Sequence, residues 1–186
     1  KNGRVSDGGV FENTNFARCL EAKTLNIPKA TPLPGSDTPV PFVFVADDAF
    51  ALTEHMMKPY PNTGLGIDKH IFNYRVSRSR QTVECAFGQM SSRFRVLAGR
   101  MELDPEPASL ITMTCCYLHN FLTKKRVRAY LDNASDRPNE HFYPLGPDHN
   151  GIPGNYAKTV RDRFCTYFNN EGSLVWQEAR VRQGRS

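Results

Sequence analysis

The stretch from Asn73 to Leu97 constrains the fold of this chain most, because its pattern predicts one long helix. Apolar residues recur there at the three- and four-residue spacing that places side chains along one face of a helix. They are Val83, Phe87, Met90, Phe94 and Leu97. We therefore expect this stripe to pack against a hydrophobic core.

Charge in the same region is strongly unbalanced. Between Lys69 and Arg100 the chain carries seven Lys or Arg and a single acid, Glu84, whereas the net charge of the whole chain is only +5. Focused positive charge points to a polyanion such as nucleic acid, with a solvated basic face as the alternative. Glu84 follows Arg80 by one helical turn, so it is either a surface ion pair or a group that holds a metal against a phosphate backbone.

The composition suits a globular protein with a core, since 39% of the 186 residues are hydrophobic and 23% are charged. The five cysteines show no metal-ligand spacing and are expected to be reduced thiols of an intracellular protein. No basic-then-apolar leader and no run of about 18 apolar residues is present, so we expect neither a signal peptide nor a membrane span. The start at Lys1 rather than Met indicates a fragment.

The N-terminal third mixes turns with short helices. Residues 6–9 (Ser-Asp-Gly-Gly) are expected to form a turn, and residues 13–20 a short capped helix. Five prolines within residues 28–41 predict a loop without regular structure. Residues 49–57 are expected to be helical, up to the break at residues 58–64.

The apolar run at residues 42–46 has no alternation and predicts a strand buried on both faces. It stops at Asp47 and Asp48, where an open α/β sheet usually places functional groups. Strand geometry points these two side chains to opposite sides. A strand-end Asp47 and a helix-edge Glu84 together can hold Mg²⁺ or Mn²⁺, while a turn or helix cap is the alternative for the Asp pair.

The C-terminal half is expected to be helical in two places. Asp104 and Pro105 start a helix that runs to about Leu122 and is apolar on most sides, so we expect it to be buried, with His119 as a hydrogen-bonded structural residue. A last helix is expected at residues 155–169. The basic cluster at residues 124–128 is either a phosphate-contacting or nuclear-import segment or a solvated helix end.

Several short motifs resemble the PIF/Harbinger transposase superfamily and its transposase-derived nucleases. The most specific is the Glu-x-x-Phe-Gly-x-x-x-x-Arg-Phe block that starts at Glu84, followed later by Leu-His-Asn at residues 118–120. Order and spacing agree over residues 1–123. The other matching segments are Phe44–Phe50, Lys58–Tyr60, Phe72–Asn73, Arg80 and Arg93–Leu97.

The resemblance implies an α/β, ribonuclease-H-like DDE nuclease fold in which an Asp-Asp-Glu triad binds two divalent ions, Mg²⁺ or Mn²⁺. Asp47 matches the second acid and Glu84 the third, with Asp48 and Asp7 as auxiliary residues. The strand of the first acid would lie before Lys1. We therefore expect residues 1–123 to be an N-terminally truncated catalytic domain with a helix-rich C-terminal half, which does not cleave DNA alone. Residues 124–186 would be a basic extension.

The function implied by the resemblance is hydrolysis of phosphodiester bonds in DNA and, in mobile elements, strand transfer in the nucleus. A separate helix-turn-helix protein would supply sequence recognition, and no membrane is involved. Two alternatives remain: a domesticated, non-catalytic nuclear protein that binds DNA or protein, and an unrelated basic nucleic-acid-binding domain. The basic residues expected to contact backbone phosphates are Arg75, Arg78, Arg80, Arg93 and Arg95.

Overall fold

A computed structural model describes residues 7–125 and 154–184, which form two compact units. The first unit contains the residues up to Arg80 together with the described C-terminal segment, and the second begins at Gln81. The helix expected at residues 155–169 therefore shares a unit with the N-terminal residues, although about 75 residues of sequence separate them.

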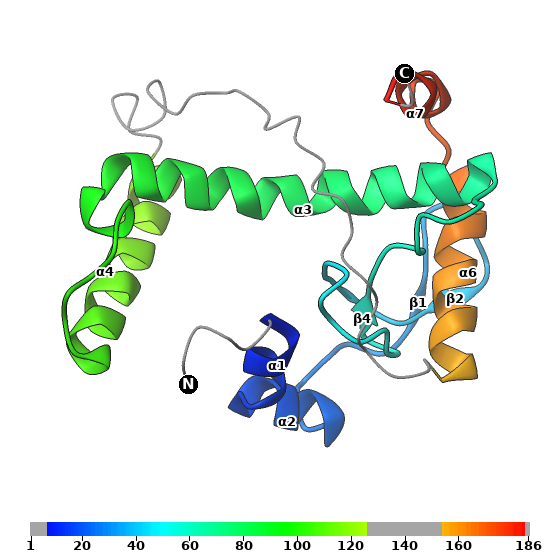
Figure 1. The fold of residues 1–186 in the computed structure, drawn as a ribbon. Helices are drawn as coiled ribbons and strands as arrows, with labels where there is room; N and C mark the ends of the chain where they lie inside the picture. Colours follow the sequence, from blue (N-terminus) through cyan, green and yellow to red (C-terminus); the bar gives the residue numbers. More distant parts are fainter. Residues whose placement is uncertain (1–6, 126–153, 185–186) are drawn as a thin grey trace. The chain divides into compact units, whose positions relative to one another are not determined.

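Figure 1 shows the elements along the chain. The helices are α1 (Asp7–Glu12), α2 (Asn15–Glu21), α3 (Ile67–Arg93), α4 (Pro105–Lys124), α6 (Asn155–Asn169) and α7 (Gln177–Gln183), and a 3-10 turn covers Arg95–Leu97. The strands are β1 (Thr31–Pro32), β2 (Pro39–Val40), β3 (Phe44–Val45) and β4 (Met56–Met57). β1 and β2 pair antiparallel, and β3 and β4 pair parallel, with Phe44 opposite Met56.

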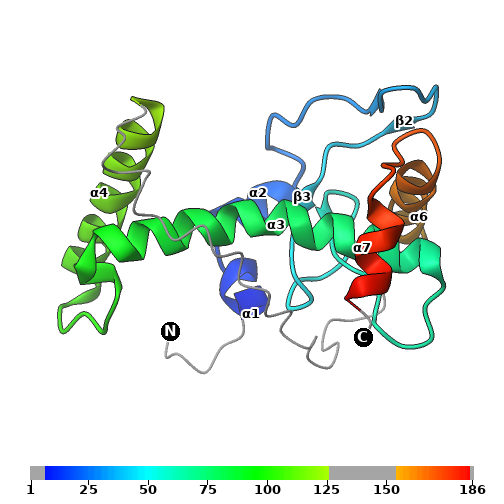
Figure 2. The same ribbon diagram turned by 90° about the horizontal axis from the view of Figure 1, so that it is seen from above.

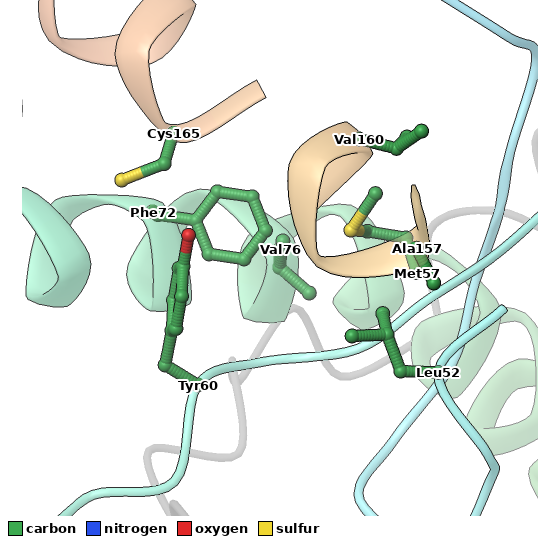
Figure 3. Packing of buried hydrophobic residues seen from close by; sticks show 8 residues of the cluster. All are labelled: Leu52, Met57, Tyr60, Phe72, Val76, Ala157, Val160 and Cys165. Atoms are coloured by element: carbon green, nitrogen blue, oxygen red, sulfur yellow. The ribbon is translucent and has the colours of Figure 1, made fainter. Parts of the chain in front are cut away.

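The core of the first unit joins three distant segments, as Figure 3 shows. Phe72 of α3 and Val160 of α6 are completely buried. Burial of one large apolar side chain contributes about 1.5–3 kcal/mol, so this contact is a main source of stability. Figures 1 and 2 show α6 and α7 beside the first turns of α3. The cluster comprises Leu52, Met57, Tyr60, Phe72, Val76, Ala157, Val160 and Cys165.

Three N-terminal segments differ in secondary structure from the sequence-based predictions. Residues 49–57 are not helical, because Met56 and Met57 pair with β3, and this tertiary pairing outweighs the local helix preference. Of the turn expected at residues 6–9, the described residues 7–9 lie instead in α1, where a side chain at Gly8 would collide with the Ala49 carbonyl oxygen. The proline-rich segment 28–41 is not wholly irregular, since it contains β1 and β2.

The strand expected at residues 42–46 is shorter and far less buried than predicted. Only Phe44 and Val45 form β3, and their side chains are 43% and 39% exposed. Successive strand residues point to opposite faces, so the exposure of both residues shows that both faces of β3 reach solvent. The prediction of a strand covered on both faces is therefore wrong for this chain.

In the second unit, α3 continues to Arg93 and stops before the predicted end at Leu97. The predicted apolar stripe is only partly buried: Met90 is 6% exposed, whereas Val83 and Phe87 are 57% and 59% exposed. A helical period places residues on one side of a helix, but it does not supply the neighbour that buries them.

Helix α4 begins at Pro105 after Asp104, as expected. The prediction that it is buried is wrong, since only Cys115 and His119 are buried, while Leu110 and Tyr117 are each 67% exposed. Its apolar residues surround the helix, and the two buried residues, Cys115 and His119, lie one turn apart on one side. Across the described ranges, no helix combines the length and apolar character that crossing a membrane requires.

Candidate functional site

Asp47 lies in the turn that follows β3. Ala46 is buried, and its amide donates to the Met57 carbonyl, which ends the strand pairing at this point. The Asp47 Oδ1 atom then accepts a hydrogen bond from the Ala49 amide at 3.0 Å. An Asp that accepts from the amide two residues ahead fixes its own side chain, so the carboxylate has a defined direction before any ligand arrives.

The second oxygen of this carboxylate contacts helix α3. Asp47 Oδ2 lies 3.4 Å from Nη2 of Arg80, and the two side chains are 30% and 27% exposed. A partly exposed pair of this kind contributes less than about 1 kcal/mol, so a ligand can displace it at low cost. Arg80 therefore links the strand-end turn to α3 within the first unit.

Asp48 has a different partner from Asp47, in line with the prediction that the two point apart. Lys58 is only 2% exposed, and its Nζ lies 3.5 Å from Asp48 Oδ1 and 3.3 Å from the Asp48 carbonyl oxygen. A buried ammonium group needs a compensating charge, and Asp48 provides it. Asp48 thus balances the charge of the buried Lys58 and has a structural role in the turn.

Glu84 lies on α3 one turn after Arg80, in the second unit, and its side chain is exposed. Apart from Gly88, its two chain neighbours and the adjoining backbone of α3, no described atom lies within 4 Å of the position that a Cβ would take on Gly88, one turn further along. The Glu84 carboxylate and the open position at Gly88 thus lie one turn apart on α3. Asp7 lies at the start of α1.

The arginines expected to contact phosphates have different surroundings. Arg75 donates to the Gly172 carbonyl oxygen at 3.2 Å and to Gln177 Oε1 at 3.0 Å, which disagrees with a role at the DNA surface. Burial lowers the pKa of the Arg75 guanidinium, and the charge of Arg78 lowers this pKa further. Arg78 and Arg95 are exposed and Arg93 is half-buried. The basic cluster at residues 124–128 lies mostly outside the described residues.

The chemistry of the two acids suits a hard divalent cation, because carboxylate oxygens are the ligands that Mg²⁺ and Mn²⁺ prefer. Asp47 has a defined direction and a weak, displaceable partner, and Glu84 is exposed. Within residues 7–125 and 154–184, no three or more His, Cys, Asp or Glu side chains gather in a way that could hold a metal ion. Asp47 and Glu84 therefore fit the ion in type, one in each unit.

A second polar cluster, around Tyr60, was not predicted from the sequence. The Tyr60 hydroxyl donates to Asp162 Oδ1 at 2.5 Å, and the Arg161 guanidinium lies 4.0 Å from the Tyr60 ring centre. Asn73 holds the Tyr60 backbone through two hydrogen bonds of 2.8 Å. Burial raises the pKa of Tyr60, and the bond to Asp162 raises it further.

These contacts join two of the motif segments, Lys58–Tyr60 and Phe72–Asn73, since Asn73 holds the segment that carries Lys58 against α3. The only sequence signal for the C-terminal partners is the pair Arg161 and Asp162 within an amphipathic helical pattern. Such a pair does not identify its partner 102 residues away.

Comparison with known proteins supports the motif-based resemblance. The model of a family described as DDE superfamily endonuclease matches residues 1–120. "Protein ALP1-like" from Arabidopsis thaliana is 29% identical over 123 residues, which cover 64% of this chain and 30% of that protein. The chain thus spans less than a third of the length of this relative. No solved structure matches the chain significantly.

Asp47 and Glu84 both fall within the matched residues, and the recognition of a Harbinger-type transposase or transposase-derived nuclease is confirmed. Since the match covers well over half of the sequence, the chain belongs to the DDE superfamily endonucleases.

Proposed function

We propose that this chain is part of a metal-dependent DNA endonuclease domain with a ribonuclease-H-like fold, in which Asp47 and Glu84 bind Mg²⁺ or Mn²⁺. The observation that carries the proposal is the position of Asp47 within the matched region, on a strand-end turn that directs its carboxylate. Glu84 contributes an exposed carboxylate from the Glu-x-x-Phe-Gly motif.

Each residue around the strand-end turn has a separate task in this proposal. The Ala49 amide directs one oxygen of Asp47, and Arg80 neutralises the other until a cation replaces it. Lys58 balances the charge of Asp48, which offsets the repulsion between the adjacent carboxylates of Asp47 and Asp48. When bound, divalent ions would activate a water molecule and stabilise the leaving oxygen of the phosphodiester.

DNA would be held through its backbone by Arg78, Arg80, Arg93 and Arg95, which gives affinity that depends on salt rather than on base sequence. The reaction would take place in the nucleus. Strand transfer, and a helix-turn-helix partner that recognises element ends, are proposals for the whole protein.

Substitution of the two acids tests the proposed catalytic role. In the intact protein, Asp47→Asn and Glu84→Gln should each lower Mg²⁺-dependent plasmid cleavage about 100-fold or more, because metal-ion stabilisation of the transition state is worth several kcal/mol. Asp37→Asn and Glu102→Gln, at exposed acids, are the matched controls and should leave cleavage unchanged. DNA affinity measured in EDTA should stay within about twofold for all four variants, since the basic residues supply it.

Undiminished cleavage by both Asp47→Asn and Glu84→Gln would remove these residues from the mechanism.

The second candidate function is a non-catalytic DNA- or protein-binding protein. It is favoured by the pairing of Asp47 with Arg80, which satisfies this carboxylate without a metal. Retained DNA binding with no cleavage by the wild-type protein in Mg²⁺ or Mn²⁺ would support this second function.

A further inference from the structure

The C-terminal segment beyond the family match packs against the start of α3. Trp176, at the N-terminus of α7, meets Tyr74 edge-to-face with ring centres 6.1 Å apart. The Arg78 guanidinium lies over the Trp176 ring, 4.7 Å from its centre. Trp176 remains 37% exposed and the neighbouring Val175 is fully exposed, so this cluster lies at the surface of the first unit.

Buried contacts beneath this cluster hold it in place. Gln177 is 4% exposed, accepts a hydrogen bond from Arg75 and donates to the Phe168 carbonyl oxygen at 2.8 Å. Val181, one turn later on α7, is also buried. Residues four apart share one side of a helix, so Gln177 and Val181 face the core, while Trp176 and Arg180 share a neighbouring side.

Among the described residues, no carboxylate forms an ion pair with the cations around Trp176. Within the described ranges, neither Arg75 nor Arg78 nor Arg180 pairs with a carboxylate. Arg182, in contrast, lies 2.6 Å from Glu178 on the same helix.

We propose that the α3–α7 surface, defined as Tyr74, Arg78, Trp176 and Arg180, binds the phosphate backbone of DNA. The proposal rests on DNA as the substrate of the proposed function and assigns a DNA-binding role to the part of the chain beyond the matched residues 1–120. A guanidinium that stacks on an aromatic ring keeps its N–H edge for bidentate contact with phosphate oxygens.

The uncompensated charge favours a polyanion over a protein partner. When surface cations contact DNA phosphates, the counterions condensed on the DNA are released, and this release is a large part of the affinity. An interface for a folded protein would instead be depleted of charged residues at its centre. Here the exposed Arg78 lies over the ring of Trp176, so the surface carries a charged residue.

Binding measured without metal tests the α3–α7 surface. Trp176 is the only tryptophan of the chain, so its emission should change when the full chain binds a duplex oligonucleotide in EDTA. The affinity of the same labelled duplex, measured by fluorescence anisotropy, gives a slope of log affinity against log salt. Arg78→Gln and Arg180→Gln should each weaken binding and reduce this slope by about one unit, the loss of one phosphate contact. Arg163→Gln, at an exposed arginine of α6, is the matched control and should change neither quantity.

Unchanged affinity and slope in both Arg78→Gln and Arg180→Gln would overturn the proposal. So would equally strong binding of polyglutamate, because that would indicate an acidic protein as the partner. Thermal unfolding of each variant checks that the fold persists. If Arg78→Gln unfolds, Arg180→Gln, on the exposed side of α7, still tests the proposal. Because EDTA excludes cleavage, loss of activity in Asp47→Asn with intact binding would leave this proposal standing. Unchanged affinity and slope in Arg78→Gln and Arg180→Gln would refute the α3–α7 surface and leave the proposed roles of Asp47 and Glu84 untouched.

Discussion

The hydrogen bond between Tyr60 and Asp162 shows at the scale of single residues how distant segments stabilise the first unit. The Tyr60 side chain is only 5% exposed, while its hydroxyl reaches a carboxylate 102 residues further along the chain. A buried phenol needs such a partner, because an unsatisfied hydroxyl in an apolar surrounding is costly.

Removal of the Tyr60 hydroxyl should destabilise the chain. Tyr60→Phe should lower the free energy of unfolding by about 1–2 kcal/mol, the range for a hydrogen bond to a charged acceptor that is itself partly exposed. Urea denaturation at pH 7 measures the change. Tyr156→Phe on α6, at a tyrosine that is 53% exposed, is the matched control and should have no effect.

The same residue predicts a loss of stability at alkaline pH. Burial, followed by the bond to Asp162, raises the pKa of Tyr60 above the ordinary value of 10.0. The unfolded chain therefore loses this proton near pH 10 while the folded chain keeps it. Stability is fully present below pH 10.0 and falls as the pH rises above it. Denaturation between pH 9 and 11 should show this decline in the wild type and a smaller one in Tyr60→Phe; equal declines would contradict it.

At the residue scale, the position of Asp47 was predictable because an abrupt end of an apolar run marks the end of a strand. Its partner was not. The sequence places Arg80 and Glu84 one turn apart on a helix, but it does not show that Arg80 also contacts Asp47, 33 residues away. Such a pairing depends on how β3 is joined to α3 through the core.

At the scale of elements, α3 differs in its surroundings along its length. Phe72 in its first half is completely buried, and Phe87 in its second half is 59% exposed. The two residues have the same side chain on the same helix and differ in burial, which makes them a matched pair.

Truncation of these two side chains should have very different effects. Phe72→Ala should lower the free energy of unfolding by about 3–5 kcal/mol, because it removes a large buried ring and leaves a cavity. Phe87→Ala, at an exposed position, should change it by no more than about 0.5 kcal/mol. Denaturant unfolding monitored by circular dichroism gives both values. A large loss for Phe87→Ala would mean that this side chain is covered.

The existence of the helices was predictable from caps and periodicity. Thr14 caps α2 by accepting from the Ala17 amide, and α6 has the bounds expected for residues 155–169. The burial of these helices was less predictable. The apolar positions on α4 show which side chains the helix could bury. Whether other elements cover those side chains depends on the tertiary fold.

At the scale of the whole molecule, the first unit depends on the chain beyond the family match. Residues 1–120 match the family, yet Ala157, Val160 and Cys165 of α6 complete the core around Phe72. Gln177 then ties α7 to Arg75 of α3. The C-terminal segment is therefore part of the folded unit.

A chain that ends at residue 153 should lose this unit. Without α6 and α7, the apolar surface around Phe72 has no cover, and we expect the cooperative unfolding transition of the first unit to disappear. Near-UV circular dichroism and denaturant titration measure the effect. Addition of a peptide of residues 154–184 should restore the signal.

Two substitutions on α6 provide the control for this truncation. Val160→Asp places a charge at a completely buried position and should reproduce the loss, while Thr159→Asp, at the exposed neighbour, should not. A cooperative transition of unchanged midpoint in the shortened chain would show that residues 7–80 fold without α6 and α7.

By itself, the sequence determined the endonuclease family, the helices α2, α4 and α6, and the acids Asp47 and Glu84 as candidate ligands. These properties depend on local periodicity, capping residues and motif spacing, which are written along the chain. Only the tertiary structure decided that Arg80 pairs with Asp47, that Lys58 is neutralised by Asp48, and that Trp176 lies under Arg78. The physical reason is that burial and charge pairing arise between segments far apart in sequence, whose meeting depends on the packing of the whole unit.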